Sequence, residues 1–184
     1  MKYFRQVHAH WIAASVEDLK MELAANERAW LHDEKRQNTV RVQRHTQSIF
    51  LRGVKKLPGE LRNSSDIHES ADSRLAALFP KSMECIRRIA AERGGELCRA
   101  LYARLEPNAV VYPHVDGGSY YACRDRYHLV IDSPSGSILR CGGEEVRMQN
   151  GELWWFDNKV LHDSENASDV WRTHLIFDLL PLAS

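Results

Sequence analysis

From Leu97 onward, the sequence is a series of short runs rich in β-branched, aromatic and aliphatic residues, separated by residues that favour turns. Many short strands at such spacing are typical of a sandwich or a small barrel of the jelly-roll kind. The expected strands are 98–105, 108–112, 127–132, 137–141, 144–148, 152–157, 160–165 and 171–179. This feature limits the C-terminal half to a mainly β fold.

The N-terminal half contains helical patterns. Ser15 and Asp18 have the form of a capping box and are followed by an apolar stripe, which predicts a helix over roughly 16–31. Pro80 interrupts a second helical pattern, which resumes over 81–93 and ends at two glycines. Between the helices, 39–52 reads as one or two strands and 58–73 as a surface loop.

The length of 184 residues predicts a single domain, 1–184, with helical support over about 15–95 and a β core over about 97–180. Twenty-five basic and 25 acidic residues leave no net charge, so nothing indicates a nucleic-acid or anionic-membrane partner. Four cysteines without C-x-x-C spacing are expected to be reduced thiols. No signal-peptide pattern and no apolar run of about 18 residues is present, which predicts a soluble, cytoplasmic protein.

His114 and Asp116 form a His-x-Asp pair at the end of an expected strand, and His162 opens a later one. Residues i and i+2 of a strand project to the same side, so both members of the pair can point into a barrel mouth. Two imidazoles and one carboxylate are the ligands of non-haem Fe(II) sites that leave positions open for oxygen chemistry. A His-x-Asp pair also arises by chance, and the alternative is a surface or capping role.

Arg172 follows His162 by ten residues, on the last expected strand. A buried guanidinium without a partner is costly, so an inward-facing arginine predicts a bound anion. A dicarboxylate would satisfy it with a bidentate pair.

Residues 98–180 resemble the aspartyl/asparaginyl β-hydroxylase family of Fe(II)/2-oxoglutarate dioxygenases, which also contains bacterial free-proline hydroxylases. The match lies in Y-P-H-V-D at 112–116, R-Y-H-L at 126–129, C-G-G-E at 141–144, W-F-D-N at 155–158 and the H…R…H-L-I run from 162 to 176. The resemblance implies a double-stranded β-helix of the jelly-roll or cupin-like type, mainly β with N-terminal helices.

The resemblance also implies residue roles. His114, Asp116 and His162 would bind iron, and Arg172 would hold the distal carboxylate of 2-oxoglutarate. Arg126 and His128 would lie near its other carboxylate, with O2 as the second cosubstrate. Some β-hydroxylases of this family lack the carboxylate ligand, so Asp116 places the chain nearer the proline-hydroxylase branch. The linker from His114 to His128 is three residues longer than in the Asp/Asn β-hydroxylases, which weakens the Arg126 assignment.

Several further residues have open alternatives. His174 shares a face with Arg172, and both cosubstrate contact and packing are open to it. His128 can equally be a core histidine. A structural role is favoured for His45 and Gln47, while the 117–125 loop reads either as a lid or as an inert surface loop.

The expected function is an Fe(II)- and 2-oxoglutarate-dependent dioxygenase that hydroxylates an unactivated C–H bond of a free amino acid, peptide or small metabolite. One alternative is a hydroxylase of a cytoplasmic protein side chain. Others are a non-catalytic cupin-like binding or sensor module, and a cupin-like enzyme that uses another metal and no cosubstrate.

Overall fold

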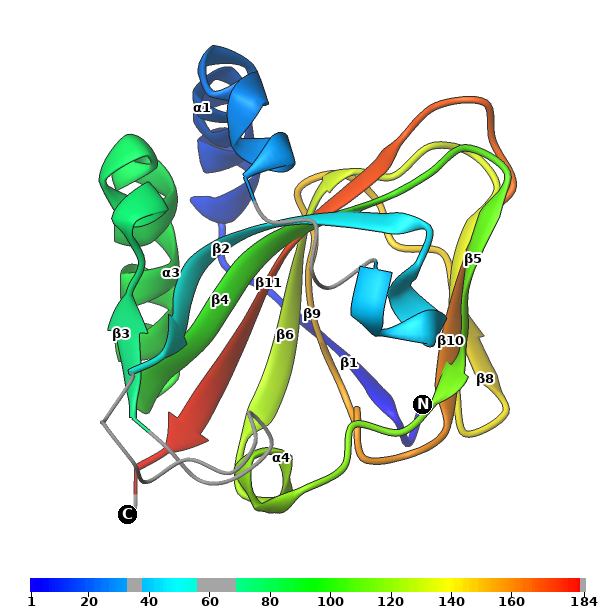
Figure 1. Ribbon diagram of the computed structural model, residues 1–184. Coiled ribbons are helices and arrows are strands. Elements are labelled where there is room, and N and C mark those ends of the chain that lie inside the picture. Colours follow the sequence, from blue (N-terminus) through cyan, green and yellow to red (C-terminus); the bar gives the residue numbers. More distant parts are fainter. Residues whose placement is uncertain (33–37, 56–68, 183–184) are drawn as a thin grey trace.

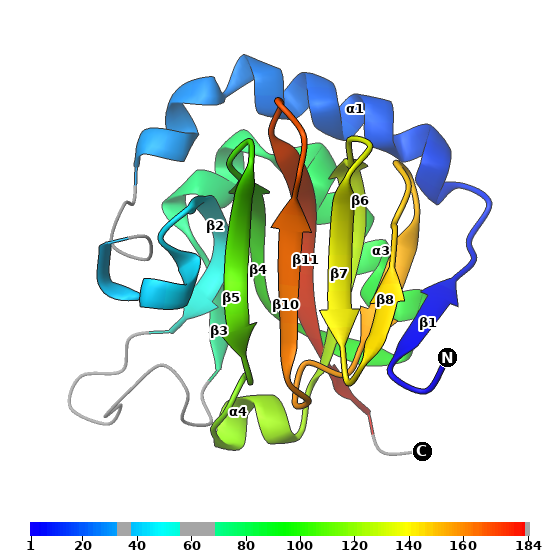
Figure 2. The ribbon, with the colours of Figure 1, turned by 90° about the vertical axis from the view of Figure 1, so that its right-hand side faces the viewer.

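Two antiparallel β-sheets face each other in the computed structural model, which describes residues 1–32, 38–55 and 69–182. In Figure 2 the smaller sheet lies in front of the larger one. The larger, seven-stranded sheet has the order β1 (Phe4–Val7), β9 (Leu153–Phe156), β6 (Asp125–Asp132), β11 (Arg172–Pro181), β4 (Gly95–Leu105), β2 (Thr46–Val54) and β3 (Ser70–Asp72). The smaller, four-stranded sheet has the order β5 (Ala109–His114), β10 (His162–Asn166), β7 (Ser137–Cys141) and β8 (Glu144–Val146).

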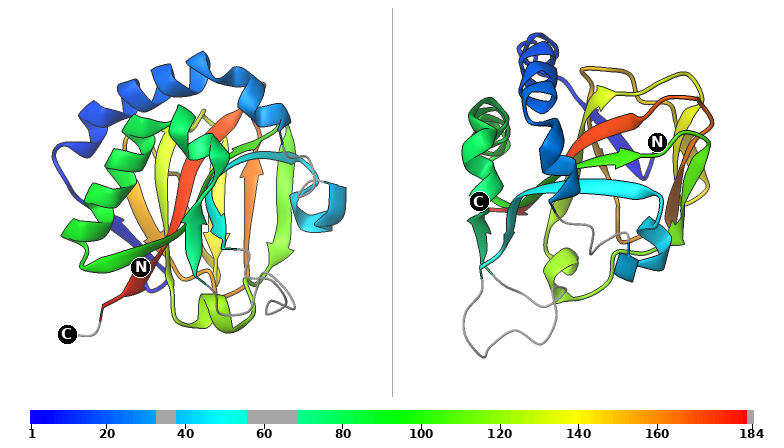
Figure 3. Two further views of the ribbon diagram at one scale, coloured as in Figure 1. Left: turned by 60° about the vertical axis from the view of Figure 1, so that its left-hand side comes forward. Right: turned by 45° about the horizontal axis from the view of Figure 1, so that its top comes forward.

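Two long helices cover the outer face of the larger sheet, away from the smaller one (Figure 1 and Figure 3). They are α1 (Ile12–Ala25) and α3 (Pro80–Glu92). The shorter helical segments are η1 (Glu27–Leu31), η2 (Arg41–Gln43), η3 (Arg74–Leu78) and α4 (Ser119–Ala122). Apolar side chains of α1 and α3 pack with the outward side chains of the sheet to form the main hydrophobic core. A second, smaller apolar cluster, which includes Val130, Leu139 and Phe156, lies between the two sheets and leaves part of that space to polar groups.

The predicted mainly β fold with N-terminal helices is confirmed, and each expected strand of the C-terminal half corresponds to a strand from β4 to β11. The first helix was predicted too late in the chain. It begins at Ile12, because the buried stripe extends back to that residue. The hydroxyl of Ser15 donates to the carbonyl of Trp11, one turn earlier, instead of capping the N-terminus.

Two other boundaries differ from the expectation. The 39–52 segment begins with the 3-10 helix η2, and its strand starts only at Thr46. The helical pattern is interrupted near Pro80 as expected, since η3 ends at Leu78. Pro80 itself occupies the first turn of α3, where its missing N–H would have had no partner. Of the expected 58–73 loop, residues 58–68 lie outside the described residues, and Ser70–Asp72 form β3 against β2.

The four cysteines are free thiols, as predicted. Three of them are buried, and Cys123 is exposed. No helix in the described part of the chain is long and apolar enough to cross a membrane.

Candidate metal centre

His114, Asp116 and His162 lie together between the two sheets, with one potential ligand atom of each within 4.8 Å of the others. His114 and His162 are cross-strand neighbours on β5 and β10, and their ring centroids are 4.3 Å apart. The Nε2 atoms of both histidines lie 3.9 Å from carboxylate oxygens of Asp116. The three residues form one compact donor set of two imidazoles and one carboxylate.

A β-bulge in β5 aims His114 inward. Ser164 of β10 pairs with Val111, but His162 pairs with His114, so β5 contains one extra residue over this interval. Val111 and His114 both line the cavity although they are three residues apart, which strict alternation along a strand does not allow. Pro113 lies within the bulge, where its lack of an N–H donor is tolerated.

Asp116 reaches the site by a different route from the one predicted. The sequence suggested that it follows His114 on the same strand, but β5 ends at His114 and Asp116 lies in the loop beyond it. Its N–H donates to the carbonyl of Asn158 at 3.0 Å, which ties this loop to the turn before β10. A backbone hydrogen bond between the two segments, rather than alternation along one strand, therefore positions Asp116 beside His114.

Both histidines present Nε2 to the site. The Nδ1 of His114 lies 2.7 Å from the carbonyl of Tyr112, and the Nδ1 of His162 lies 2.8 Å from that of Val160. A carbonyl can only accept, so Nδ1 carries the proton and Nε2 keeps its lone pair. Burial lowers the pKa of His162, which favours the neutral, ligating form.

The carboxylate of Asp116 is held from one side. Its Oδ2 accepts hydrogen bonds from Nη1 of Arg126 at 2.6 Å and from Nδ2 of Asn158 at 2.9 Å. No residue of the described chain donates a hydrogen bond to Oδ1. Burial opposes ionisation, but Arg126 and the Asn158 hydrogen bond outweigh it and hold the pKa of Asp116 down at about 2. Asp116 is thus an anion with one free oxygen.

Arg126 joins Asp116 to a second buried carboxylate, Asp178. Nε and Nη2 of Arg126 donate to Oδ1 and Oδ2 of Asp178 at 2.8 and 3.1 Å. The hydroxyl of Tyr120 donates to Oδ2 of Asp178 at 3.2 Å. Sequence analysis did not single out Asp178 or Asn158. Asp178 lies an even number of residues after Arg172, and that spacing was the one available signal that it faces the same interior.

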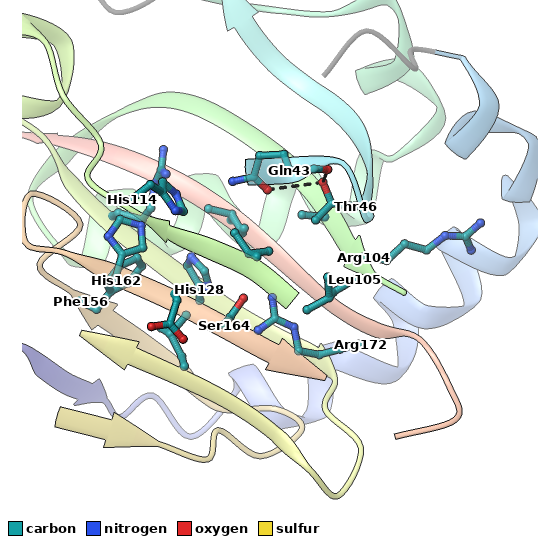
Figure 4. Close-up of a pocket in the computed structure, with 16 residues that line it drawn as sticks. Gln43, Thr46, Arg104, Leu105, His114, His128, Phe156, His162, Ser164 and Arg172 are labelled. Carbon is teal, nitrogen blue, oxygen red and sulfur yellow. Dashed lines mark hydrogen bonds between the residues drawn. The ribbon is translucent and has the colours of Figure 1, made fainter. Parts of the chain in front are cut away.

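A cavity of about 500 Å³, counted with its opening to solvent, runs between the sheets from the histidines to Arg172 (Figure 4). In Figure 4 the imidazoles lie at one end and the guanidinium of Arg172 at the other, with His128 and Ser164 between them. The Arg172 side chain is buried, and its Nε has no hydrogen-bond partner among the described residues. Burial lowers the pKa of Arg172 to about 10. This end of the cavity thus offers a buried cation whose charge is not matched within the described chain.

His128 and His174 form a buried pair beside this cavity. Their Nδ1 atoms are 3.1 Å apart, so one ring donates and the other accepts. Burial and the nearby arginines lower the pKa of both well below the ordinary value, and both are neutral. His128 lines the cavity, whereas Nε2 of His174 is buried and finds no partner within residues 1–32, 38–55 and 69–182.

A family model described as aspartyl/asparaginyl beta-hydroxylase matches residues 14–181. The chain belongs to this family. A curated relative, the L-proline cis-4-hydroxylase of Rhizobium meliloti (strain 1021), is 32% identical over 75 residues. That match covers 41% of this chain and only 27% of the relative.

Solved structures share the fold of this aspartyl/asparaginyl beta-hydroxylase family member. A viral collagen prolyl hydroxylase from Paramecium Bursaria Chlorella virus-1, in complex with 2OG, superposes with a TM-score of 0.57 at 12% identity, covering 98% of this chain and 97% of that one. A prolyl-4-hydroxylase from Pseudomonas putida gives 0.57 at 17% identity, with 98% and 93% covered. These matches confirm the double-stranded β-helix.

Other sequence candidates lie away from the metal centre of this β-hydroxylase family member. His45 contacts Glu106 at 3.0 Å and Gln47 accepts from Arg104 at 2.8 Å, and neither lines the cavity. The 117–125 loop contains α4, and Tyr120 within it is fully buried. That segment is therefore anchored to the sheet by Tyr120.

Proposed function

We propose that the protein is an Fe(II)- and 2-oxoglutarate-dependent dioxygenase that hydroxylates an unactivated C–H bond of a free amino acid, a peptide or another small metabolite. The observation that carries this proposal is the content of one cavity. It holds a His-Asp-His donor set at one end and, at the other, a buried arginine whose Nε has no hydrogen-bond partner among the described residues. Family membership supports the same assignment.

The three donors fit Fe(II). Two neutral imidazoles with free Nε2 lone pairs and one ionised carboxylate oxygen form the set that selects this metal and leaves coordination positions open. His114, Asp116 and His162 would hold the ion.

The far end of the cavity fits the distal carboxylate of 2-oxoglutarate. A carboxylate there would pair with Arg172 and satisfy its Nε. His128, between the metal ligands and Arg172, stays our candidate for the cosubstrate's remaining polar groups. His174 is not in the cavity wall and would act through its contact with His128. Arg126 stays a prediction for cosubstrate contact, although its Nε, Nη1 and Nη2 are already engaged by Asp116 and Asp178.

Iron with 2-oxoglutarate and O2 supplies an oxidant strong enough to attack an unactivated C–H bond. The chain contributes orientation and shielding. The backbone carbonyls of Tyr112 and Val160 fix the two histidine tautomers, and Asn158 and Arg126 fix Asp116. His162 and Arg172 are both buried, which shields these two groups from bulk solvent.

A small substrate with an aliphatic part suits the inner surface. Leu101, Ala103 and Ile176 form a buried apolar cluster with Phe50 packed against it, and Ala103 and Ile176 line the cavity. The name of the curated relative, an L-proline hydroxylase, supports a free amino acid. A non-catalytic module would have no need of this donor set.

An anaerobic titration of the purified protein with Fe(II) and then 2-oxoglutarate tests the proposal. We expect the visible metal-to-ligand charge-transfer absorption of a 2-oxoglutarate complex, which neither His114→Ala nor Arg172→Ala should give at the same concentrations. A screen of free amino acids, L-proline among them, for stimulated succinate release then addresses the substrate. Saturable Fe(II) binding without any 2-oxoglutarate-dependent absorption would contradict the proposal.

A further inference from the structure

Asp178 is a buried carboxylate that pairs with Arg126, a residue of the cavity wall beside the metal centre. It lies on β11 directly opposite Arg126 of β6 and is 2% exposed. It is not within the compact donor set, so it does not serve as a ligand. A carboxylate is costly to desolvate, so a buried one beside Arg126 suggests that it has a role at the site.

The geometry of the guanidinium supplies that reason. Asp178 takes the edge of Arg126 formed by Nε and Nη2, in a bidentate pair. Only Nη1 then reaches Asp116, and it reaches a single oxygen, Oδ2. With its Nε edge free, Arg126 could turn that edge toward Asp116 and take both oxygens, because fork-to-fork pairing is the preferred geometry of arginine with a carboxylate. Asp178 thus keeps Oδ1 of Asp116 available.

The charges lead to the same conclusion. Asp116 and Arg126 alone would cancel, and with two neutral imidazoles the site would present no net charge to a cation. With Asp178 ionised, the buried cluster of two carboxylates and one guanidinium carries one negative charge. A dication is attracted to this cluster more strongly than to a neutral one.

We propose that Asp178 is a positioning residue for the metal centre, which holds Arg126 in the orientation that leaves Oδ1 of Asp116 free and restores the negative charge that Arg126 would cancel. Tyr120 supports this arrangement, since its hydroxyl donates to Oδ2 of Asp178. The inference rests on the proposed function, because it requires that His114, Asp116 and His162 bind a divalent metal.

Titration of the metal-free protein with Co(II) in the absence of cosubstrate, followed by the d–d absorption of the bound ion, tests the role of Asp178. Asp178→Asn keeps the shape of the side chain and removes its charge. Loss of a group that orients a metal ligand costs roughly 10- to 100-fold in metal affinity, so we expect at least a tenfold weaker Co(II) dissociation constant. The matched control is Asp72→Asn, which removes a carboxylate that pairs with Arg52 and Arg87 on the far edge of the sheet. It should bind Co(II) as the native protein does.

A second variant, Arg126→Lys, keeps the positive charge and loses the planar fork. This variant should also bind Co(II) more weakly than the native protein. The double variant, Asp178→Asn with Arg126→Lys, should lose no more Co(II) affinity than whichever single variant binds more weakly, because Asp178 acts through Arg126. Co(II) binding by Asp178→Asn within twofold of native would overturn the inference. If that variant does not fold, native-like Co(II) affinity in Arg126→Lys would overturn it instead. Native-like Co(II) binding by His114→Ala would overturn the metal site itself and with it the proposed function.

Discussion

The two ends of the cavity differ in how completely the described chain satisfies their polar groups. At the metal end, the histidine Nδ1 atoms, Arg126 and Oδ2 of Asp116 all have partners. Apart from the three atoms that face one another, Oδ1 of Asn158 is the buried side-chain atom there that lacks a partner in the described residues. At the far end, Nε of Arg172 and Nε2 of His174 are buried without partners in the described residues. The described chain itself orients the metal-ligating groups at the first end, and we expect an anion to pair with Arg172 at the second.

The two ends should therefore contribute differently, the metal end to the stability of the folded protein and the Arg172 end to ligand affinity. The ion pairs around Arg126 belong to the folded state, so breaking them should cost stability before any ligand is present. The desolvated Arg172 opposes folding in the ligand-free protein, so removing it should cost affinity instead. Four predictions test this separation, from the largest effect to the smallest.

Removing a histidine of the donor set breaks the metal end outright. His114→Ala or His162→Ala should reduce Fe(II)- and substrate-dependent succinate formation by more than about 100-fold, because two ligands do not hold the metal in the required geometry. The control His10→Ala changes an exposed histidine outside the donor set. Turnover near the native rate in either variant would contradict the assignment of the ligands.

Arg126→Met tests whether the metal end contributes to folding. The substitution leaves Asp116 and Asp178 buried without their shared cation, and breaking a buried pair in this way costs about 3–5 kcal/mol. The free energy of unfolding of the metal-free protein, measured in urea, should fall by that amount. A loss below about 1 kcal/mol would show that the ion pairs add little to the fold.

Arg172→Met tests the opposite expectation for the far end. The ligand-free protein should be as stable as the native one or more stable, since an apolar chain replaces a buried guanidinium that has no acidic partner in the described part of the chain. The affinity for 2-oxoglutarate should fall about 100-fold, roughly 2.7 kcal/mol, through loss of a charge-assisted pair. Calorimetric titration and urea unfolding of the same sample measure both. An unchanged affinity would remove Arg172 from this role.

The smallest effect concerns pH and the buried pair of histidines, His128 and His174, beside the cavity. Burial lowers the pKa of His128 and His174 well below 6.5, so the unfolded chain binds more protons than the folded one as the pH falls below 6.5. Stability should then decrease with falling pH, by about 2 kcal/mol between pH 7 and pH 5.5 for two such groups. His174→Phe should flatten this dependence. Equal stability of the native protein at both pH values would contradict the neutral, buried pair.

Local patterns in the sequence sufficed for the strands and for the composition of the donor set. Turn residues between apolar runs placed β4 to β11 to within a few residues. The family resemblance indicates His162 and Arg172 as site residues, and both side chains line the cavity. The assignment of 1–184 as one domain and the individual residue roles stay predictions.

Other features depend on contacts that no local pattern contains. The extra residue in β5 is visible only against the register of β10, and the position of Asp116 depends on a backbone contact with Asn158. The contact of Asp178 with Arg126 depends on the pairing of β11 with β6, which joins two residues that are 52 positions apart in the sequence. The helix α1 starts early because Ile12 is buried by tertiary packing.

The bulge at Tyr112 and Pro113 sets the phase of strand β5. Upstream of it, odd-numbered positions such as Val111 face the cavity, and downstream of it the even-numbered His114 does. Point substitutions leave this phase intact, whereas losing or gaining one residue in the segment would turn the imidazole of His114 to the outside of the sheet. Within this strand, the number of residues is therefore under a stricter constraint than the identity of most of them.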